Sequence, residues 1–400
     1  MMGESLLAPL RHPGYRRLWI GQTVSVFGDK VDQIAMAVMV YRLTGSMLQM
    51  GVMLAVTTLP AALFGLVAGA YVDRWDRRRT MVGSDLLRAG LVLVIPFAAR
   101  LNVAAAYVVA FAVSTVSLFF EPAKLASIPE LVPSEELMAA NSLDGTTSAA
   151  AEIVGLLLAG GLVAGVGYVR AFALDAVTYL VSAVFVASIR LPRRSRSTAE
   201  HVGGVWADVG EGLRHIRDVP ALREAMALYC VAAAGVAASV TLCYALALSH
   251  FDAGAVGLAL LDIAATGGVL LGSIAVGRSG SARVGRKFIQ GMIAFGLLFG
   301  SIAMAPRLEV AMALLFLAGI ANMWYHVPLI TLVQRAAKTA LLGRVLSART
   351  AISRVFTVVG FVGAGALAQR VGIPVAVAAV GAIVFGAGLV GLGMPGLREE

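Results

Sequence analysis

Acidic side chains within apolar stretches are the residues of this sequence best suited to chemistry. An ionisable group at the centre of a bilayer costs about 3 kcal/mol on insertion scales, so such groups usually serve a function. If Asp29 or Asp32 lines a cavity without a close cation, the loss of hydration favours proton binding, and the carboxylate can couple transport to proton movement. Five polar residues share this face of one predicted helix: Gln22, Ser25, Asp29, Asp32 and Gln33.

The alternative for Asp29 is a structural ion pair with Lys30 or with an arginine of the eleventh apolar stretch. Lys30 lies about 100° away around the helix axis, which also places it to reach an acid on a neighbouring helix. Asp85 and Arg88, in the third apolar stretch, are expected to pair with each other or with the nearby arginine-rich loop.

These residues belong to a chain whose composition requires a membrane. Hydrophobic residues make up 59% of the 400 positions and charged residues only 14%, with a mean hydropathy of +0.86, which is outside the range of soluble domains. The two cysteines, Cys230 and Cys243, fall in one apolar stretch, so neither a disulfide framework nor a zinc site is expected. The first ten residues lack the pattern of a signal peptide, so the first span should be retained.

Apolar runs between charged residues or Pro/Gly punctuation predict twelve spans of about 20 residues each. The first six are residues 18–41, 47–72, 81–99, 103–127, 142–166 and 171–189. The second six are residues 223–249, 254–277, 287–305, 310–333, 345–368 and 373–394. We therefore predict an all-α integral membrane protein with an N-terminal six-helix bundle (1–190), a cytoplasmic linker with an amphipathic surface helix (191–222) and a C-terminal six-helix bundle (223–400).

Basic residues accumulate in alternate loops, and by the positive-inside rule these loops face the cytoplasm. Both termini are therefore predicted to be cytoplasmic, in the inner membrane of a bacterium. The net charge of +9 then requires no nucleic-acid partner. In the linker, Val205, Val209, Leu213 and Ile216 form one apolar stripe, which favours a helix lying against the inner leaflet over a docking site for a partner.

The two halves repeat each other at a spacing of about 204 residues, since EELMAANSL from Glu135 corresponds to TALLGRVLS from Thr339. Such repeats are typical of transporters that bind substrate between two halves near the membrane midplane. Phe119-Phe120-Glu121-Pro122 and Trp324-Tyr325-His326-Val327-Pro328 occupy matching positions. We expect Glu121 and His326 to flank the cytoplasmic mouth of a cavity, where histidine changes charge near physiological pH. The alternative is a kinked helix with satisfied polar groups.

Residues 69–79, at the junction of the second and third predicted spans, read GAYVDRWDRRR. This sequence resembles the signature G-x-x-x-D-R-x-G-R-R of the major facilitator superfamily, with Asp76 in place of the second glycine. The segments RRLWIGQTVSVFGD, VYRLTGS, DRRRTMVGSDLLRAG and ELVPSEELMAANSL resemble the branch with the enterobactin exporter and macrolide-type effluxers. The resemblance implies a gating role for this group: Gly69, Asp73, Arg74, Arg77 and Arg78.

In that family Asp73 would accept hydrogen bonds near the cytoplasmic start of the eleventh span and latch the outward-facing state, with Arg74 and Arg77 in the same charge network. The alternative is that these arginines only set the topology. The resemblance also makes the spans of Glu152 and Asp262 neighbours, so that the two acids are expected to share a proton or grip a cation, or else to form structural contacts. Gly155 to Gly161 is similar to an antiporter signature but has Leu156 in place of proline, and close helix approach explains it equally well.

The leading functional hypothesis is export of amphipathic small molecules, such as drugs, siderophores or macrolides, by proton antiport. The wide apolar interior of such a protein suits substrates selected by size and hydrophobicity. We expect a monomer in contact with membrane lipids, with no cofactor or bound metal and the proton gradient as the energy source.

Two other transport functions stay open, and an enzyme is not expected. The segment EPAKLASIPEL resembles lysophospholipid transporters, which favours lipid movement between leaflets. Ferroportin-like transporters share a Gly-Asp pair in the first span, but the sequence shows no convergent set of His, Cys and carboxylate ligands for metal export. A membrane enzyme would need a nucleophile, a base and an orienting group near one membrane face, and none is evident.

Overall fold

Long helices account for nearly all of the chain that the structure describes. The structure is a computed structural model that describes residues 7–72, 75–133, 136–191, 205–279, 283–337 and 341–398. Within these ranges it contains helices and connections but no strand. The chain divides into two compact units, the first formed by Met1–Met39 with Leu59–Val202 and the second by Val40–Thr58 with Gly203–Glu400. The domain boundaries expected from the sequence remain a prediction.

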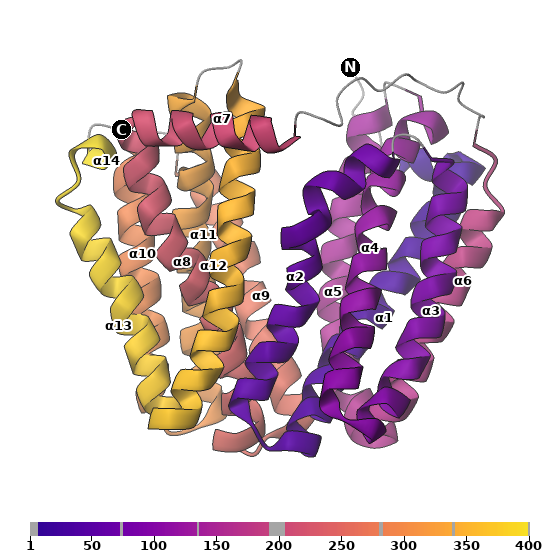
Figure 1. The fold of residues 1–400 in the computed structure, drawn as a ribbon, viewed down its shortest axis with the longest axis horizontal. Helices are drawn as coiled ribbons and strands as arrows, with labels where there is room; N and C mark the ends of the chain where they lie inside the picture. Colours follow the sequence, from indigo (N-terminus) through magenta and orange to yellow (C-terminus); the bar gives the residue numbers. More distant parts are fainter. Residues whose placement is uncertain are drawn as a thin grey trace. The chain divides into compact units, whose positions relative to one another are not determined.

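The N-terminal part of the chain begins with a short turn, η1 (Ala8–Arg11), followed by six long helices. They are α1 (Pro13–Thr44), α2 (Met47–Val72), α3 (Arg77–Leu101), α4 (Val103–Leu131), α5 (Leu137–Val166) and α6 (Tyr168–Ala187). In the first unit α3 packs against α4 and α6 (Figure 1). The end of α1 and the start of α2 group with the second unit, where Ser46 Oγ contacts Gln369 Oε1 at 3.1 Å.

The remaining elements form the rest of the second unit. They are α7 (Val205–Asp218), α8 (Pro220–Ala245) continued by the π-helical turn η3 (Leu246–His250), α9 (Gly254–Arg278), α10 (Val284–Ser301) with the turn η4 (Ile302–Met304), α11 (Leu308–Ala336), α12 (Leu342–Val371), α13 (Ile373–Gly391) and α14 (Pro395–Arg398). Helix α11 packs against α9 and α10, and α8 packs against α12 and α13. A Cβ on Gly268 or Gly319 would overlap the other helix, so these glycines allow α9 and α11 to pack closely.

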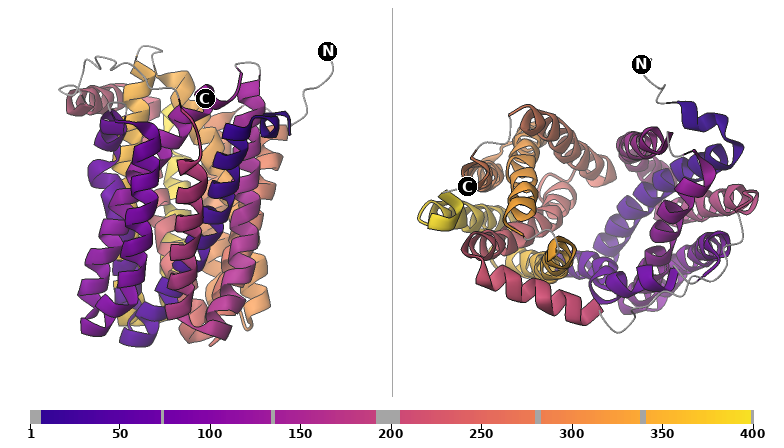
Figure 2. Two further views of the ribbon diagram at one scale, coloured as in Figure 1. Left: turned by 90° about the vertical axis from the view of Figure 1, so that its right-hand side faces the viewer. Right: turned by 90° about the horizontal axis from the view of Figure 1, so that it is seen from above.

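The predicted linker helix is present as α7. It lies crosswise over the ends of α8 and α12, as Figures 1 and 2 show, and it packs against both. Ile216 is buried, whereas Leu213 of the predicted apolar stripe is exposed. The carboxylate of Glu211 pairs with Arg344 of α12. Contact with α8 and α12 therefore accounts for part of the apolar stripe, and contact with the inner leaflet remains a prediction.

Eleven helices in the described part of the chain are long and apolar enough to cross a membrane, from α2 to α6 and from α8 to α13. Each of them coincides with a predicted span. The remaining predicted span, residues 18–41, lies within α1. This helix has 32 residues but carries three charged residues near its centre. Two of them contact neighbouring helices: Lys30 binds Glu152 of α5 and Asp29 binds Tyr179 of α6, so these charged groups do not face lipid.

Candidate functional site

The polar face of α1 lies against α6. A Cβ at Gly28 would overlap the side chains of Asp175 and Thr178 of α6, and a Cβ at Gly21 would lie 3.3 Å from the Cα of Ser182. Glycine at these two positions therefore brings the helices close together, as small residues do in membrane proteins. Gln22, the residue after Gly21, donates to Ser182 Oγ at 3.1 Å. The contact of the two helices places the acids of α1 beside Asp175, the one acid of α6.

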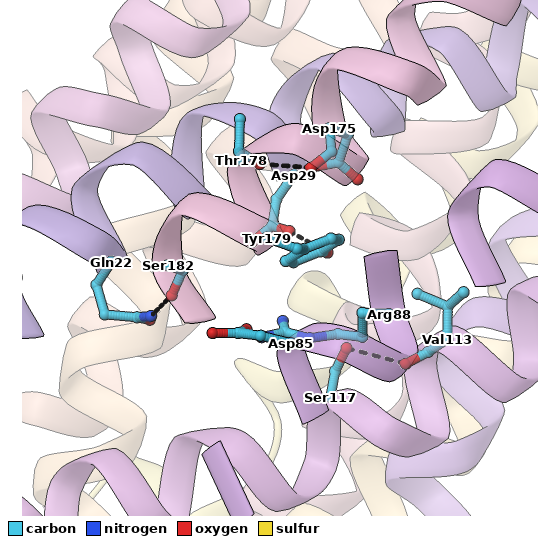
Figure 3. A network of polar contacts seen from close by, with 10 residues as sticks. All are labelled: Gln22, Asp29, Asp85, Arg88, Val113, Ser117, Asp175, Thr178, Tyr179 and Ser182. Carbon is cyan, nitrogen blue, oxygen red and sulfur yellow. Dashed lines mark hydrogen bonds and ion pairs between the residues drawn. The ribbon is translucent and has the colours of Figure 1, made fainter. Parts of the chain in front are cut away.

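Asp29 is bound directly to α6. The hydroxyl of Tyr179 donates to Asp29 Oδ1 at 2.5 Å, as drawn in Figure 3. Tyr179 is buried. A hydrogen bond from a phenol to a carboxylate in a low-dielectric interior is stronger than one in water. Asp29 therefore has a hydrogen-bond donor at close range rather than an ion-pair partner.

A buried arginine, Arg88, stacks on the Tyr179 ring. The Arg88 Cζ is 4.3 Å from the Tyr179 ring centroid and 4.8 Å from that of Phe120. Arg88 also donates to Asp85 Oδ1, three residues earlier in α3. The expected pairing of these two residues is therefore present, and it places a cation next to the Asp29–Tyr179 contact.

Two further carboxylates near this contact are incompletely hydrogen bonded. Asp175 of α6 is completely buried; its Oδ1 accepts from Thr178 Oγ1 at 3.1 Å, and its Oδ2 has no hydrogen-bond partner. Asp32 Oδ1 is also buried without a partner. Sequence reasoning singled out Asp32 but missed Asp175. The sequence did indicate Asp175, because it is an acid within the apolar run 171–189.

Lys30 points away from the acids on its own helix. Its Nζ lies 2.5 Å from Glu152 Oε1 of α5 and 3.4 Å from Gln33 Oε1. The close approach of α5 is possible because Gly155 has no side chain to meet Lys30. Lys30 thus reaches an acid on a neighbouring helix, and the alternative of an Asp29–Lys30 ion pair is wrong. Glu152 is an ion-pair partner within the first unit, whereas Asp262 belongs to α9 of the second unit, so sharing of a proton between them remains a prediction.

Glu121 and His326 have different surroundings despite their matching sequence positions. Lys124 Nζ lies 3.1 Å from both Glu121 Oε1 and Asp144 Oδ2, and the Glu121 side chain is 56% exposed. His326 of α11 lies beside Tyr229 of α8, with ring centroids 6.4 Å apart. Their role at a cytoplasmic mouth stays a prediction.

Arg349 of α12 contacts the same tyrosine as His326, Tyr229 of α8. It donates to the Tyr229 hydroxyl at 3.0 Å, and its Cζ lies 4.7 Å from the Tyr229 ring centroid. Arg349 lies in the eleventh predicted span, 345–368, and an ion pair between Asp29 and an arginine of that span stays a prediction. Within its own unit, the guanidinium stacks on an aromatic ring.

The signature loop is described in part. Gly69 lies in α2, and Asp73 and Arg74 lie outside the described residues. Asp76 caps α3, since its carboxylate accepts from the Arg79 backbone N–H at 2.8 Å. The departure from the family pattern therefore supplies a helix cap.

The two arginines that follow Asp76 bind neighbouring helices. Arg77 lies 2.8 Å from Glu130 Oε1 of α4, and Arg78 donates to the Ala187 carbonyl of α6. These contacts tie the start of α3 to the ends of α4 and α6. Both arginines therefore have partners within the first unit, in addition to any effect on topology.

Comparison with known proteins identifies the family. Residues 18–360 match the Major Facilitator Superfamily. The chain is 27% identical to macrolide efflux protein A of Streptococcus pyogenes, over 89% of each chain, and 27% identical to the multidrug efflux pump Tap of Mycobacterium tuberculosis, over 93% of this chain and 91% of that one. The crystal structure of a nucleoside transporter, NupG, has the same fold, with a TM-score of 0.78 at 10% identity over 95% of this chain and 99% of that one. The family match covers most of the chain, and eleven helices in the described ranges are able to span a membrane. This multi-pass membrane protein therefore belongs to the Major Facilitator Superfamily of transporters.

Proposed function

We propose that this protein is a secondary active transporter that exports amphipathic small molecules of drug, siderophore or macrolide type by proton antiport. It would act in the inner membrane of a bacterium with both termini in the cytoplasm, as a monomer, with the proton gradient as its energy source and no cofactor. It would move its substrate without chemical change and would not be an enzyme.

The similarity to two efflux proteins over at least 89% of the chain is the observation that carries the proposal of export. At 27% identity, the substrate of this chain can differ from those of the two efflux proteins and is to be identified by experiment. The residue composition is consistent with an amphipathic substrate, since membrane helices rich in Met, Phe and Ala offer many apolar contacts and few polar ones.

The contact between Asp29 and Tyr179 supports the proton-coupled part of the proposal. Asp29 lies well inside α1, and its close partner is a hydroxyl and not a cation. In its ionised form it is stabilised by the Tyr179 hydroxyl and by the nearby Arg88 charge. In its protonated form it removes one charge from the membrane interior, which lowers the cost of a change between conformations.

Exchange of substrate for a proton follows if substrate binds better when Asp29 is ionised and the empty carrier returns more readily when Asp29 is protonated. A proton from the outside would neutralise Asp29 and favour the return of the empty carrier, and loss of the proton to the cytoplasm would restore the form that binds substrate. Each state would bind one ligand better than the other, which is the requirement for coupling. The alternating movement of two repeats around a fixed site would carry both steps.

Transport by purified protein in proteoliposomes tests this proposal. A panel of amphipathic fluorescent compounds is supplied with and without an imposed pH gradient, and Asp29→Asn is compared with the wild type. Asp218→Asn, in the exposed end of α7, serves as a matched control for loss of an aspartate charge. We expect gradient-driven movement in the wild type and in the control, and loss of that movement in Asp29→Asn. Absence of gradient-driven movement in the wild type for every compound would contradict the proposal.

A further inference from the structure

The contact of α1 with α6 holds more acid than base. Asp29 and Asp32 come from α1, Asp85 from α3 and Asp175 from α6, and Arg88 is the cation among them. Arg88 is paired with Asp85, and the nearby Lys30 is paired with Glu152. The other three acids, Asp29, Asp32 and Asp175, belong to no ion pair among the described residues. If all were ionised, three negative charges would lie close together inside the membrane.

Such an arrangement is unfavourable unless protons are bound. Like charges in a shared site and the loss of hydration both oppose ionisation, and a buried group neutralises rather than remain charged and unpaired. Asp29 has the Tyr179 hydroxyl as donor, so its ionised form is supported. Asp175 has a weaker donor, because the Thr178 hydroxyl that lies 3.1 Å from its Oδ1 is closer, at 2.7 Å, to the Asp175 backbone carbonyl, and Asp32 Oδ1 has none. These are therefore the acids that we expect to carry a proton.

The hydrogen-bond geometry points to the same two residues. Asp175 Oδ2 and Asp32 Oδ1 are both buried and have no partner. An ionised carboxylate only accepts hydrogen bonds, whereas a protonated one also donates. One proton bound to either residue would supply a donor for the other, so that a single proton satisfies both. Asp175 meets α1 at Gly28, and Asp32 follows Gly28 by one helical turn, so both acids belong to the same part of the α1–α6 contact.

We propose that Asp175 and Asp32 form a buried carboxyl pair that binds one exchangeable proton between α6 and α1. This inference rests on the proposed proton coupling and extends it, since it adds a second protonation site beside Asp29. Figure 3 shows Asp175 next to Asp29 and Tyr179, above Arg88 and Asp85. The pair would stay protonated when Asp29 is ionised, and it would release its proton only when the surroundings of the α1–α6 contact change.

The charged and titratable groups facing the pair set its behaviour. Asp29 on α1 opposes loss of the proton, and Arg88 on α3 favours it, although Asp85 offsets much of the Arg88 charge. Tyr179 and Thr178 of α6 supply hydroxyl groups, and Thr178 already donates to Asp175. Lys30 and Glu152, between α1 and α5, neutralise each other.

Infrared difference spectroscopy of the purified protein tests the pair without any substrate. A protonated carboxyl group gives a carbonyl stretch outside the amide region, and this band is recorded while the pH is raised from neutral. We expect a band that disappears at alkaline pH in the wild type and that loses most of its amplitude in both Asp175→Asn and Asp32→Asn. Asp144→Asn is the control, because Asp144 is ion-paired with Lys124 and its loss should leave the band unchanged.

The outcomes separate this inference from the proposal of export. An unchanged band in both Asp175→Asn and Asp32→Asn would overturn the pair, even if the wild type exports its substrates by proton antiport. A band that is removed by sodium at constant pH would make the ligand a metal cation and would also overturn it. Conversely, loss of the band in the variants would support the pair even if no tested compound is transported. Since the two acids lie on different helices, misfolding of one variant leaves the other as a test.

Discussion

In each unit a described arginine stacks on a tyrosine ring, but the two arginines have different neighbours. In the first unit, Arg88 lies 4.3 Å from the Tyr179 ring and pairs with Asp85, beside three further acids. In the second, Arg349 lies 4.7 Å from the Tyr229 ring, donates to its hydroxyl and has His326 nearby, with no ion pair among the described residues. The first site therefore has an excess of acidic side chains, whereas the second has a guanidinium group beside a tyrosine and a histidine. The same stacking contact thus occurs in two electrostatic settings.

The largest difference between the sites should appear when the arginines are removed. Arg88→Met leaves Asp85 buried without its cation, and breaking a buried pair in this way costs about 3–5 kcal/mol. Arg349→Met removes a hydrogen bond and a cation–π contact, which together contribute about 2 kcal/mol. We expect a much larger loss of thermal stability in detergent for Arg88→Met. The double variant Arg88→Met with Asp85→Asn should recover part of that loss, and equal effects at the two arginines would contradict the comparison.

The next largest effect concerns coupling. Because a positioned proton carrier contributes about 100-fold or more to a proton-dependent step, Asp29→Asn should lower gradient-driven transport by about 100-fold. His326→Asn, in the second unit, should retain a gradient-driven component. The measurement is the initial rate of substrate movement at several imposed pH gradients. A larger loss in His326→Asn than in Asp29→Asn would move the coupling site to the second unit.

Removing the tyrosine hydroxyls should sharpen the contrast further. The Tyr179 hydroxyl donates to Asp29, so it favours the ionised carboxylate. In Tyr179→Phe that hydrogen bond is lost while the ring stays over Arg88. Because a hydrogen bond to a charged group contributes about 1.5–3 kcal/mol, gradient-driven transport should fall by about tenfold or more. Tyr229→Phe loses a bond from Arg349 and should keep gradient-driven transport near the wild-type rate; an equal loss in both variants, or no loss in either, would count against the assignment.

The smallest effect is expected at the matched positions Glu121 and His326. The His326 ring packs beside Tyr229. If His326 also contacts substrate at the expected cytoplasmic mouth, removing an aromatic contact of about 1 kcal/mol should lower the apparent affinity for substrate about fivefold. Glu121→Gln should change affinity less, because the Glu121 side chain is largely exposed and Lys124 keeps Asp144 as its partner. Saturation curves for substrate at two pH values measure both. If each variant leaves transport and its pH dependence intact, the expected cytoplasmic mouth is not formed by these residues.

Much of the fold could be predicted from the sequence because membrane helices are defined by length and hydropathy. The predicted span 47–72 coincides with α2, and the linker helix was expected from its apolar stripe. Helix α1 was harder to place, since its charged residues are compatible with a bilayer only when they face other helices.

The candidate site could be predicted only in part. The face of Asp29 and Asp32 follows from helical periodicity, and Lys30 was placed to reach an acid on another helix. Asp175 was missed because one acid in an apolar run does not reveal which neighbour it faces. That depends on Gly28, whose missing side chain allows α6 to approach α1. Similarly, the role of Asp76 as a helix cap depends on where α3 begins, which the family pattern with glycine does not indicate.

The most direct test of the central claim, that acids of the first unit carry the coupled proton, is substrate-driven proton movement. Proteoliposomes with a trapped pH-sensitive dye receive a substrate gradient and no pH gradient. The account predicts a pH change in the wild type, none in Asp29→Asn and a retained change in Arg349→Gln. A pH change of wild-type size in Asp29→Asn would contradict it.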